Sequence, residues 1–158
     1  MPVESATNYA SREALIRRYG WVTQHVAASE DGSRPDYCYT VGLHDQGWPE
    51  LILLGVPMEH GHVMMRSLVT AMKALPDARQ FLGRMQLEEW ESPIYVLEPD
   101  QQAVAVGYAG MSALRSGGEA RYLHVCLADP AGLFPWEHGF DRSLGNLIFL
   151  LGPTPVLH

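Results

Sequence analysis

The order of apolar and polar residues predicts a short helix followed by a hairpin. Residues 11–19 place their apolar side chains on one helical stripe, and Gly20 stands where a helix would end. Residues 21–27 and 37–43 read as strands, the second with alternate side chains on one face, and turn-forming residues at 30–35 lie between them. We therefore expect an N-terminal helix that leads into two paired strands.

A nearly continuous apolar run from Glu50 to Val56 is typical of a strand that is buried on both faces. Beyond it, apolar residues recur at helical spacing from Pro57 to Leu75, where Pro57 suits the first turn and Pro76 ends the pattern. These two segments predict the centre of a sheet and the main helix that packs across it.

The rest of the pattern completes a fold class. It predicts short strands at 94–97 and 103–106, a short helix at 108–115 and a last strand at 122–127. Residues 77–91 are predicted mostly as connection. The expectation is a single α+β domain over residues 1–158, with a mixed or mainly antiparallel sheet of five or six strands and the main helix, about 57–75, on one face. Residues 141–158 are interpreted as a C-terminal tail.

Composition narrows the class of protein. The 158 residues are 47% hydrophobic and 18% charged, with a formal net charge of −7. The apolar fraction is too high for a disordered chain, and the acidic balance argues against nucleic-acid binding. Because the charged fraction lies below the roughly 25% typical of soluble domains, we expect part of the surface to be covered by a partner or by a second copy in a homodimer.

The sequence predicts a cytoplasmic protein with reduced thiols. Cys38 and Cys126 both lie inside apolar segments, where a cysteine behaves as a small buried hydrophobe. The first 13 residues contain no basic segment followed by an apolar one, and no apolar run reaches the roughly 20 residues that span a bilayer. Secretion and membrane insertion are therefore not expected.

Two segments carry more special residues than packing alone requires. The first is Tyr39-Thr40-Val41-Gly42-Leu43 with Pro49-Glu50-Leu51, and the second is Asp129-Pro130-Ala131-Gly132-Leu133-Phe134-Pro135-Trp136-Glu137. With the early Gly20-Trp21 pair, they make the chain, over about residues 15–140, resemble a bacterial family, domain-of-unknown-function family 4262. Family members commonly have histidine where this chain has Trp48. The resemblance implies no activity, cofactor or catalytic residue.

Gly42 and Glu50 are candidate site residues on physical grounds. A glycine inside a strand marks a bulge or a close approach, either by a ligand or by an aromatic side chain such as Trp48 or Trp136. A carboxylate that enters a core is either paired, here with Arg34, Arg121 or Arg142, or has the raised pKa of a general base; the third interpretation of Glu50 is an exposed strand end. The alternatives stay open for each residue.

The two segments predict an aromatic, acidic cleft if their loops rise at the same end of the sheet. The loop around Phe134 and Trp136 either covers a pocket or packs back on the core. The candidate ligand-binding residues are Tyr39, Thr40, Gly42, Trp48, Asp129 and Trp136. The candidate catalytic residues are Glu50, Glu137 and His44.

Metal and phosphate sites are poorly supported. His60 and His62 are two residues apart, so on a helix they diverge; only on an extended segment would they face one way, with His44 or His124 as a third ligand. No nucleophile elbow or phosphate-binding loop is present. The predictions therefore include no metal site, and the sequence identifies no cofactor.

The leading functional hypothesis is a module that binds a small molecule or a protein partner in this cleft. The first alternative is an enzyme that uses Glu50, Glu137 or His44 as general acid or base, or a flavin-dependent redox protein, since the strand and helix order from Tyr37 to Leu75 is similar to flavin-binding split barrels. The second is an antitoxin or immunity protein whose acidic surface masks a basic partner.

Overall fold

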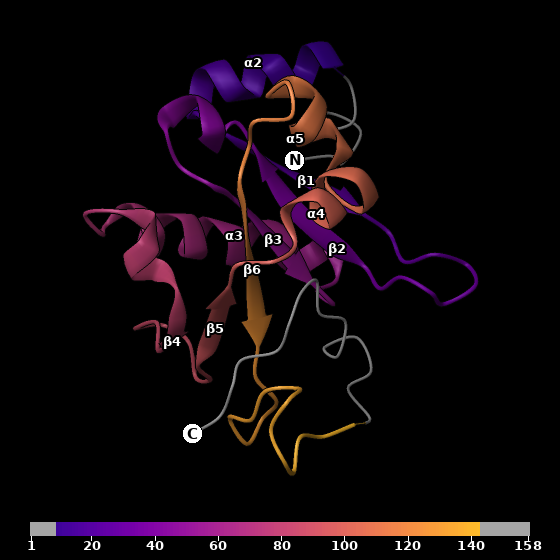
Figure 1. The fold of residues 1–158 in the computed structure, drawn as a ribbon, viewed down its shortest axis with the longest axis vertical. Coiled ribbons are helices and arrows are strands. Elements are labelled where there is room, and N and C mark those ends of the chain that lie inside the picture. Colours follow the sequence, from indigo (N-terminus) through magenta and orange to yellow (C-terminus); the bar gives the residue numbers. More distant parts are fainter. Residues whose placement is uncertain (1–8, 143–158) are drawn as a thin grey trace.

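In the part of the chain that the structure describes, six strands form one sheet, and the helices pack against it (Figure 1). The computed structural model describes residues 9–142. Its strands are β1 (Val22–Val26), β2 (Tyr37–Val41), β3 (Glu50–Leu54), β4 (Gly83–Met85), β5 (Ile94–Leu97) and β6 (Tyr122–Leu127). Its α-helices are α2 (Tyr9–Tyr19), α3 (Met58–Lys73), α4 (Gln101–Gly107) and α5 (Gly110–Arg115), and its 3-10 helices are η1 (Leu43–Gln46) and η2 (Ala78–Phe81).

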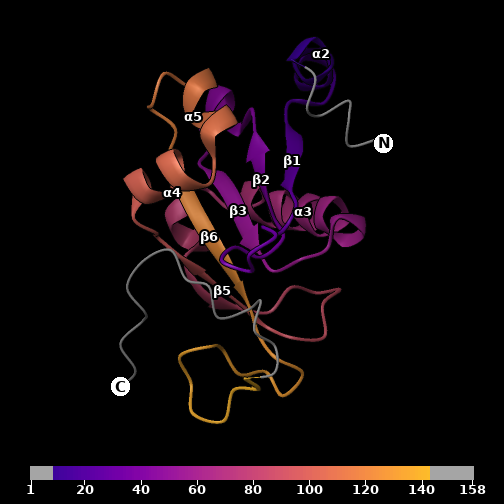
Figure 2. The same ribbon diagram turned by 90° about the vertical axis from the view of Figure 1, so that its right-hand side faces the viewer.

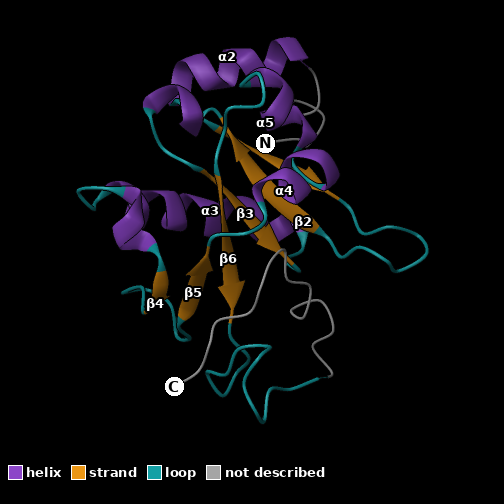
Figure 3. Ribbon diagram, viewed as in Figure 1, coloured by secondary structure: helices purple, strands orange, loops and turns teal. Residues whose placement is uncertain are grey.

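The sheet is mixed and mainly antiparallel, as the sequence predicts. The strand order is β1-β2-β3-β6-β5-β4, and Figure 3 shows the strands as one open layer. Only β3 and β6 run parallel, with Glu50 opposite Tyr122; every other neighbouring pair is antiparallel. All five residues of β3 are buried, which confirms that this strand lies inside the sheet. The starts of β3 and β6 therefore lie at the same end of the sheet.

Helices cover both faces of the sheet (Figure 2). On one face, α3 packs its apolar side against Leu51 and Leu53 of β3 and Val125 of β6. On the other face, Ile52 and Leu54 meet the cluster that includes residues of α2 and α4. This alternation is the physical reason why β3 reads as a continuous apolar run, since successive side chains enter two different cores.

The predicted elements are confirmed with small shifts, except one. Residues 103–106 form no strand but the middle of α4, so that prediction is wrong. The Asp100 carboxylate accepts a hydrogen bond from Ala103 N (3.0 Å) and starts a helix. Gln101 then bonds the backbone of Tyr122 through both ends of its amide, at 2.9 and 2.7 Å. The helix cap of Asp100 and the two hydrogen bonds of the Gln101 amide thus explain why residues 103–106 form a helix, although their apolar side chains also suit a strand.

The segment 77–91, predicted as mostly connection, contains η2 and the edge strand β4. Both cysteines are buried and free, as expected. No helix within residues 9–142 is long and apolar enough to cross a membrane. The predicted C-terminal tail lies outside the described residues from position 143 onward.

Candidate functional site

Glu50 begins β3 as a fully buried carboxylate, 1% exposed. Its Oε1 accepts hydrogen bonds from Thr40 Oγ1 (2.7 Å) and Leu43 N (3.1 Å). Its Oε2 accepts from Gly42 N (3.1 Å) and His44 N (3.2 Å). The carboxylate thus holds the backbone that enters η1, and both of its oxygens are occupied by donors.

The sequence hypothesis of an arginine partner for Glu50 is wrong. No ion pair to Glu50 occurs among the described residues. Three backbone N–H groups and the Thr40 hydroxyl satisfy the charge instead, as expected of a buried polar group. Burial raises the pKa of Glu50, and the four hydrogen bonds act in the opposite direction. Because no surface of the carboxylate is open, a general-base role for Glu50 has no geometric support.

Gly42 lies against main chain rather than against a ligand or an indole ring. Its φ of +117° lies in the region that favours glycine. A Cβ at this position would stand 2.8 Å from the Gly20 carbonyl oxygen and 3.0 Å from Trp21 Cα. The two sequence interpretations of Gly42 are thus replaced by a third, in which the turn after α2 and the turn after β2 touch.

Side chains of η1 extend this contact to the helices. Gln46 Nε2 donates a hydrogen bond to the Gly20 carbonyl oxygen at 2.8 Å. The Arg115 guanidinium of α5 pairs with Asp45 (2.7 Å) and with Glu13 of α2 (2.9 Å). The hydrogen bonds of Glu50 therefore fix the short loop between β2 and β3. Its contacts with the turn after α2 and with α5 fix it further.

A cavity of about 380 Å³ opens beside this loop. We call it the Trp48 pocket. It lies where β3 and β6 begin and β5 ends, because β5 runs antiparallel to β6 with Leu97 opposite His124. The lining residues come from four segments: His44, Gly47, Trp48, Pro49, Ala78, Arg79, Leu82, Glu98, Glu119, Arg121, Tyr122 and Leu123.

The pocket wall carries ionisable side chains that pair with no other described residue. Within residues 9–142, the side chains of His44, Glu98, Glu119 and Arg121 make no hydrogen bond or ion pair. Arg79 is paired, with Asp77 at 3.1 Å on the surface. The pocket therefore combines an indole wall with a free guanidinium, a free imidazole and two free carboxylates.

The second predicted segment lies at the other end of the sheet. Trp136 stacks on Phe134, with ring centroids 5.2 Å apart, and the Tyr95 ring meets both at its edge. Glu137 Oε1 accepts a hydrogen bond from Phe134 N at 2.9 Å. Of the two interpretations of this loop, packing back on the sheet describes the structure, since Phe134 is 1% exposed.

The Asp129 carboxylate holds that loop in place by accepting hydrogen bonds from backbone N–H groups of the loop. Its Oδ1 accepts from Ala131 N (3.0 Å) and Leu133 N (2.8 Å), and its Oδ2 accepts from Asp141 N (2.9 Å). The hydrogen bond from Leu133 N leads a set of backbone donors that lower the pKa of Asp129. The carboxylate is thus an internal anchor for the chain that follows β6.

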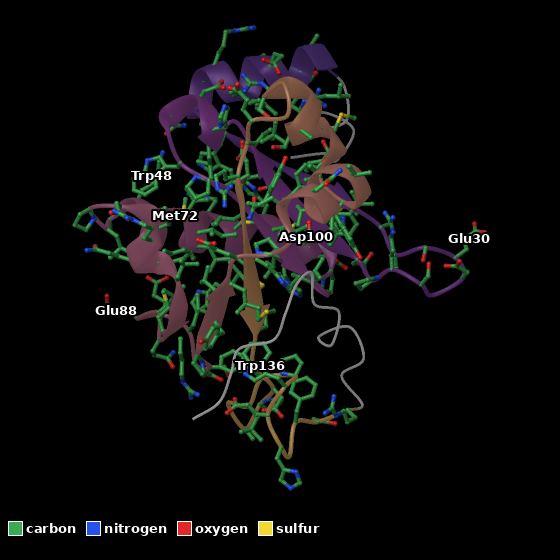
Figure 4. All side chains as sticks on the ribbon, viewed as in Figure 1. Glu30, Trp48, Met72, Glu88, Asp100 and Trp136 are labelled. Atoms are coloured by element: carbon green, nitrogen blue, oxygen red, sulfur yellow. The ribbon has the colours of Figure 1, made fainter. Side chains whose placement is uncertain are left out.

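The prediction of one shared cleft is wrong. Asp129 follows the end of β6, whereas Glu50 starts the parallel β3, so the two loops leave opposite ends of the sheet. Figure 4 shows Trp48 and Trp136 far apart on the molecule. Tyr39 is a buried core residue whose hydroxyl accepts a hydrogen bond from Met111 N at 3.3 Å. Of the nine candidate residues, His44 and Trp48 line the Trp48 pocket; Thr40, Gly42 and Glu50 form its support.

The histidines do not gather. His60 and His62 both lie in α3, so the alternative of an extended segment is wrong; His62 Nδ1 instead meets Thr23 Oγ1 at 2.8 Å. His124 is buried on β6 beside Cys126, and burial lowers its pKa to about 4. No group of three or more His, Cys, Asp or Glu side chains in the described chain is placed to hold a metal ion.

Sequence reasoning did not place the four other charged residues of the Trp48 pocket there, namely Arg79, Glu98, Glu119 and Arg121; it named Arg121 only as a possible partner of Glu50. Glu98 follows the predicted strand 94–97 directly, and Arg121 precedes the strand 122–127 directly. Charged residues that flank strands were therefore a usable signal. The signal becomes specific only once β6 is known to pair with β3, and β5 with β6, which brings these flanking residues to one end of the sheet.

Comparison with known proteins returns one family. A family model described as Domain of unknown function (DUF4262) matches residues 15–141, which is most of the chain. Comparisons with curated proteins and with solved structures gave no match.

The first prediction concerns Glu50. In Glu50→Gln an NH₂ group replaces one oxygen and faces two of the four donors, so we expect the free energy of unfolding to fall by about 3 kcal/mol. Urea denaturation at pH 7 measures this loss, with the exposed Glu98→Gln as control. A Glu50→Gln protein that is as stable as wild type would contradict the supporting role and restore the general-base hypothesis.

The second prediction concerns Gly42. Gly42→Ala combines a positive φ with a Cβ 2.8 Å from a carbonyl oxygen, whereas Gly32→Ala has a φ of +74° and open space. We expect Gly42→Ala to lose about 2 kcal/mol more stability than Gly32→Ala. Thermal and urea unfolding of both variants measure the difference. Equal losses would mean that the contact with Gly20 contributes nothing.

The third prediction concerns pH. Because the pKa of Asp129 is lowered in the folded state, its contribution to stability is present above the unfolded value and is lost as pH falls below about 4. Asp129→Asn should therefore be less stable than wild type at pH 7, and the gap should narrow in acid. Urea midpoints from pH 7 to about pH 3 test this. A gap that stays constant with pH would refute it.

Proposed function

The chain belongs to the DUF4262 family, and we propose that it is a small-molecule-binding protein whose ligand occupies the Trp48 pocket. The observation that carries the proposal is a pocket wall that combines an indole ring with Arg121, Glu98 and Glu119, whose side chains pair with no other residue among those that the structure describes. The proposed ligand is a zwitterion, that is, a compact apolar or aromatic body that bears both a carboxylate and an ammonium group.

Size supports this choice. Binding pockets for small organic ligands are typically about 300–1,000 Å³, and the Trp48 pocket is at the lower end, at about 380 Å³. A volume of this kind suits a ligand of amino-acid size. Trp48, Pro49 and Leu82 supply apolar surface for its body.

Charge supports the zwitterion. Arg121 offers a planar guanidinium, which suits bidentate contact with a carboxylate, and His44, which also lines the pocket, adds a further donor. Glu98 and Glu119 offer acceptors for an ammonium group. A purely anionic ligand would leave the two carboxylates opposed to it, and a purely cationic one would leave Arg121 opposed.

Rigidity supports binding as well. His44 and Trp48 stand on a loop that Glu50, Gln46 and Asp45 tie to three other elements. A loop held in place before the ligand arrives loses little conformational entropy on binding. The buried hydrogen bonds beneath the loop thus favour a binding role over a merely structural one for this end of the sheet.

Of the three candidate general acids and bases, only His44 lines this pocket. Glu50 is enclosed, and Glu137 stands at the far end of the sheet. The flavin and immunity-protein hypotheses remain predictions that no contact of the described residues favours. Binding without chemistry is therefore the function that the geometry supports best.

The fourth prediction tests binding with three matched probes. L-phenylalanine carries both charges, 3-phenylpropanoate lacks the ammonium and phenethylamine lacks the carboxylate. We expect phenylalanine to shift the Trp48 indole N–H signal in two-dimensional NMR at about tenfold lower concentration than either relative, since each charged hydrogen bond adds about 1.5–3 kcal/mol. Trp48→Phe assigns that signal among the four indoles of the chain.

Two variants complete the test. Arg121→Gln should weaken phenylalanine to the level of phenethylamine, whereas the exposed Arg17→Gln on α2 should leave its binding unchanged. If all three probes shift the Trp48 signal equally, the zwitterion assignment is wrong. If none shifts it at about 10 mM, the proposal that this pocket binds such molecules is overturned.

A further inference from the structure

The outer edge of β1 offers backbone hydrogen-bonding groups that are not used. β1 is the first strand in the sheet order, and among the described strands it pairs only with β2. Within residues 9–142, no loop or further strand bonds its backbone. An open strand edge of this kind is a template for pairing with another chain.

β1 also lacks the features that usually block such pairing. Its sequence is Val-Thr-Gln-His-Val, without a charged residue or a proline. Its two polar side chains on the α3 face are turned toward that helix and the segment before it. Thr23 Oγ1 meets His62 at 2.8 Å, and His25 Nε2 meets the Val56 carbonyl oxygen at 3.4 Å.

Opposite charges flank the two ends of β1. Arg17 and Arg18 are exposed at the end of α2, just before the strand. Glu30 and Asp31 are exposed just after it, and Figure 4 shows Glu30 at the tip of a projecting loop. Hydrogen bonds from the backbone and side chain of Ser33 lower the pKa of Asp31 to about 2, so this carboxylate is ionised at neutral pH.

The order of these charges along the chain favours pairing with a second copy, and it favours the antiparallel direction of the two β1 strands. Two copies that pair antiparallel through β1 place the arginines of each beside the acidic pair of the other. Parallel pairing would place like charges together. Antiparallel pairing of two identical strands is also self-complementary, which is the arrangement of a twofold dimer.

We infer that the partner of the β1 edge is a second copy of this chain, joined antiparallel about a twofold axis that passes between the two β1 strands near their midpoints, so that one sheet runs across both copies. Tyr19, 62% exposed between Arg18 and the strand, adds apolar surface beside the shared edge. The inference does not depend on the proposed ligand, because the Trp48 pocket lies among β3, β5 and β6.

The fifth prediction is a dimer whose formation protects β1. Sedimentation velocity over a roughly hundredfold range of protein concentration should show a monomer–dimer equilibrium. Hydrogen exchange at both ends of that range should show outward amides of β1 that exchange slowly in the dimer and fast in the monomer. A chain that stays monomeric throughout overturns the inference. So does a monomer with protected β1 amides, which would mean that another segment of the same chain covers the edge.

Reversing the charges of residues that flank β1 tests whether this strand forms the dimer interface. Arg18→Glu and Glu30→Arg should each raise the dissociation constant of the dimer by about tenfold, and the double variant should recover most of the loss, since opposed charges are restored. Glu91→Arg, an exposed change beyond β4, is the matched control. A dimer that responds to none of these changes, with β1 amides still exchanging fast, uses another surface and refutes the assignment to β1.

Discussion

The buried carboxylate of Glu50 sets the geometry on which the rest of this end of the molecule depends. A charge that leaves water must find donors, and here it finds three backbone N–H groups in succession, from Gly42 to His44, together with the Thr40 hydroxyl. Those donors converge only if the chain turns sharply after β2, which is where Gly42 adopts its positive φ. The same turn brings the chain against Gly20, so α2 and β1 are placed by it as well. One side chain at the start of the central strand thus determines where the loop with His44 and Trp48 stands.

Local patterns predicted the elements of the fold well, because each depends on its own residues. The run from Glu50 onward was identified as the buried strand, and the helical spacing after Pro57 as the main helix. The prediction of a strand at residues 103–106 is wrong, since Asp100 caps a helix there and the Gln101 amide bonds the backbone of β6. An apolar segment of four residues suits either element, and the decision came from a capping carboxylate and an amide outside the segment. Predictions from periodicity therefore hold where the segment is long and fail where a flanking polar residue decides.

The site was less predictable, because it depends on partners that are distant in the sequence. Glu50 could be recognised as a buried carboxylate, but its partners could not, since backbone donors leave no mark in a sequence while arginines do. The shared cleft failed for a related reason. Whether the loops after Val41 and Leu127 meet depends on the direction of β6 relative to β3, and these strands are joined by a crossover of α3, β4, β5, α4 and α5. Nothing in either motif records that they run parallel.

The parallel pair also explains why the two ends of the sheet differ in character. At the end where β3 and β6 begin, strand starts and the end of β5 bring charged flanking residues together around Trp48. At the other end, Asp129 turns its carboxylate inward to three backbone donors, and Phe134 and Trp136 fill the space against Tyr95. Both ends therefore use a buried carboxylate to shape a loop, but Glu50 holds the loop that precedes its own strand, whereas Asp129 holds the loop that it begins. The Trp48 pocket and the β1 edge share no residue, so the proposed ligand and the proposed second copy would occupy separate parts of the same sheet.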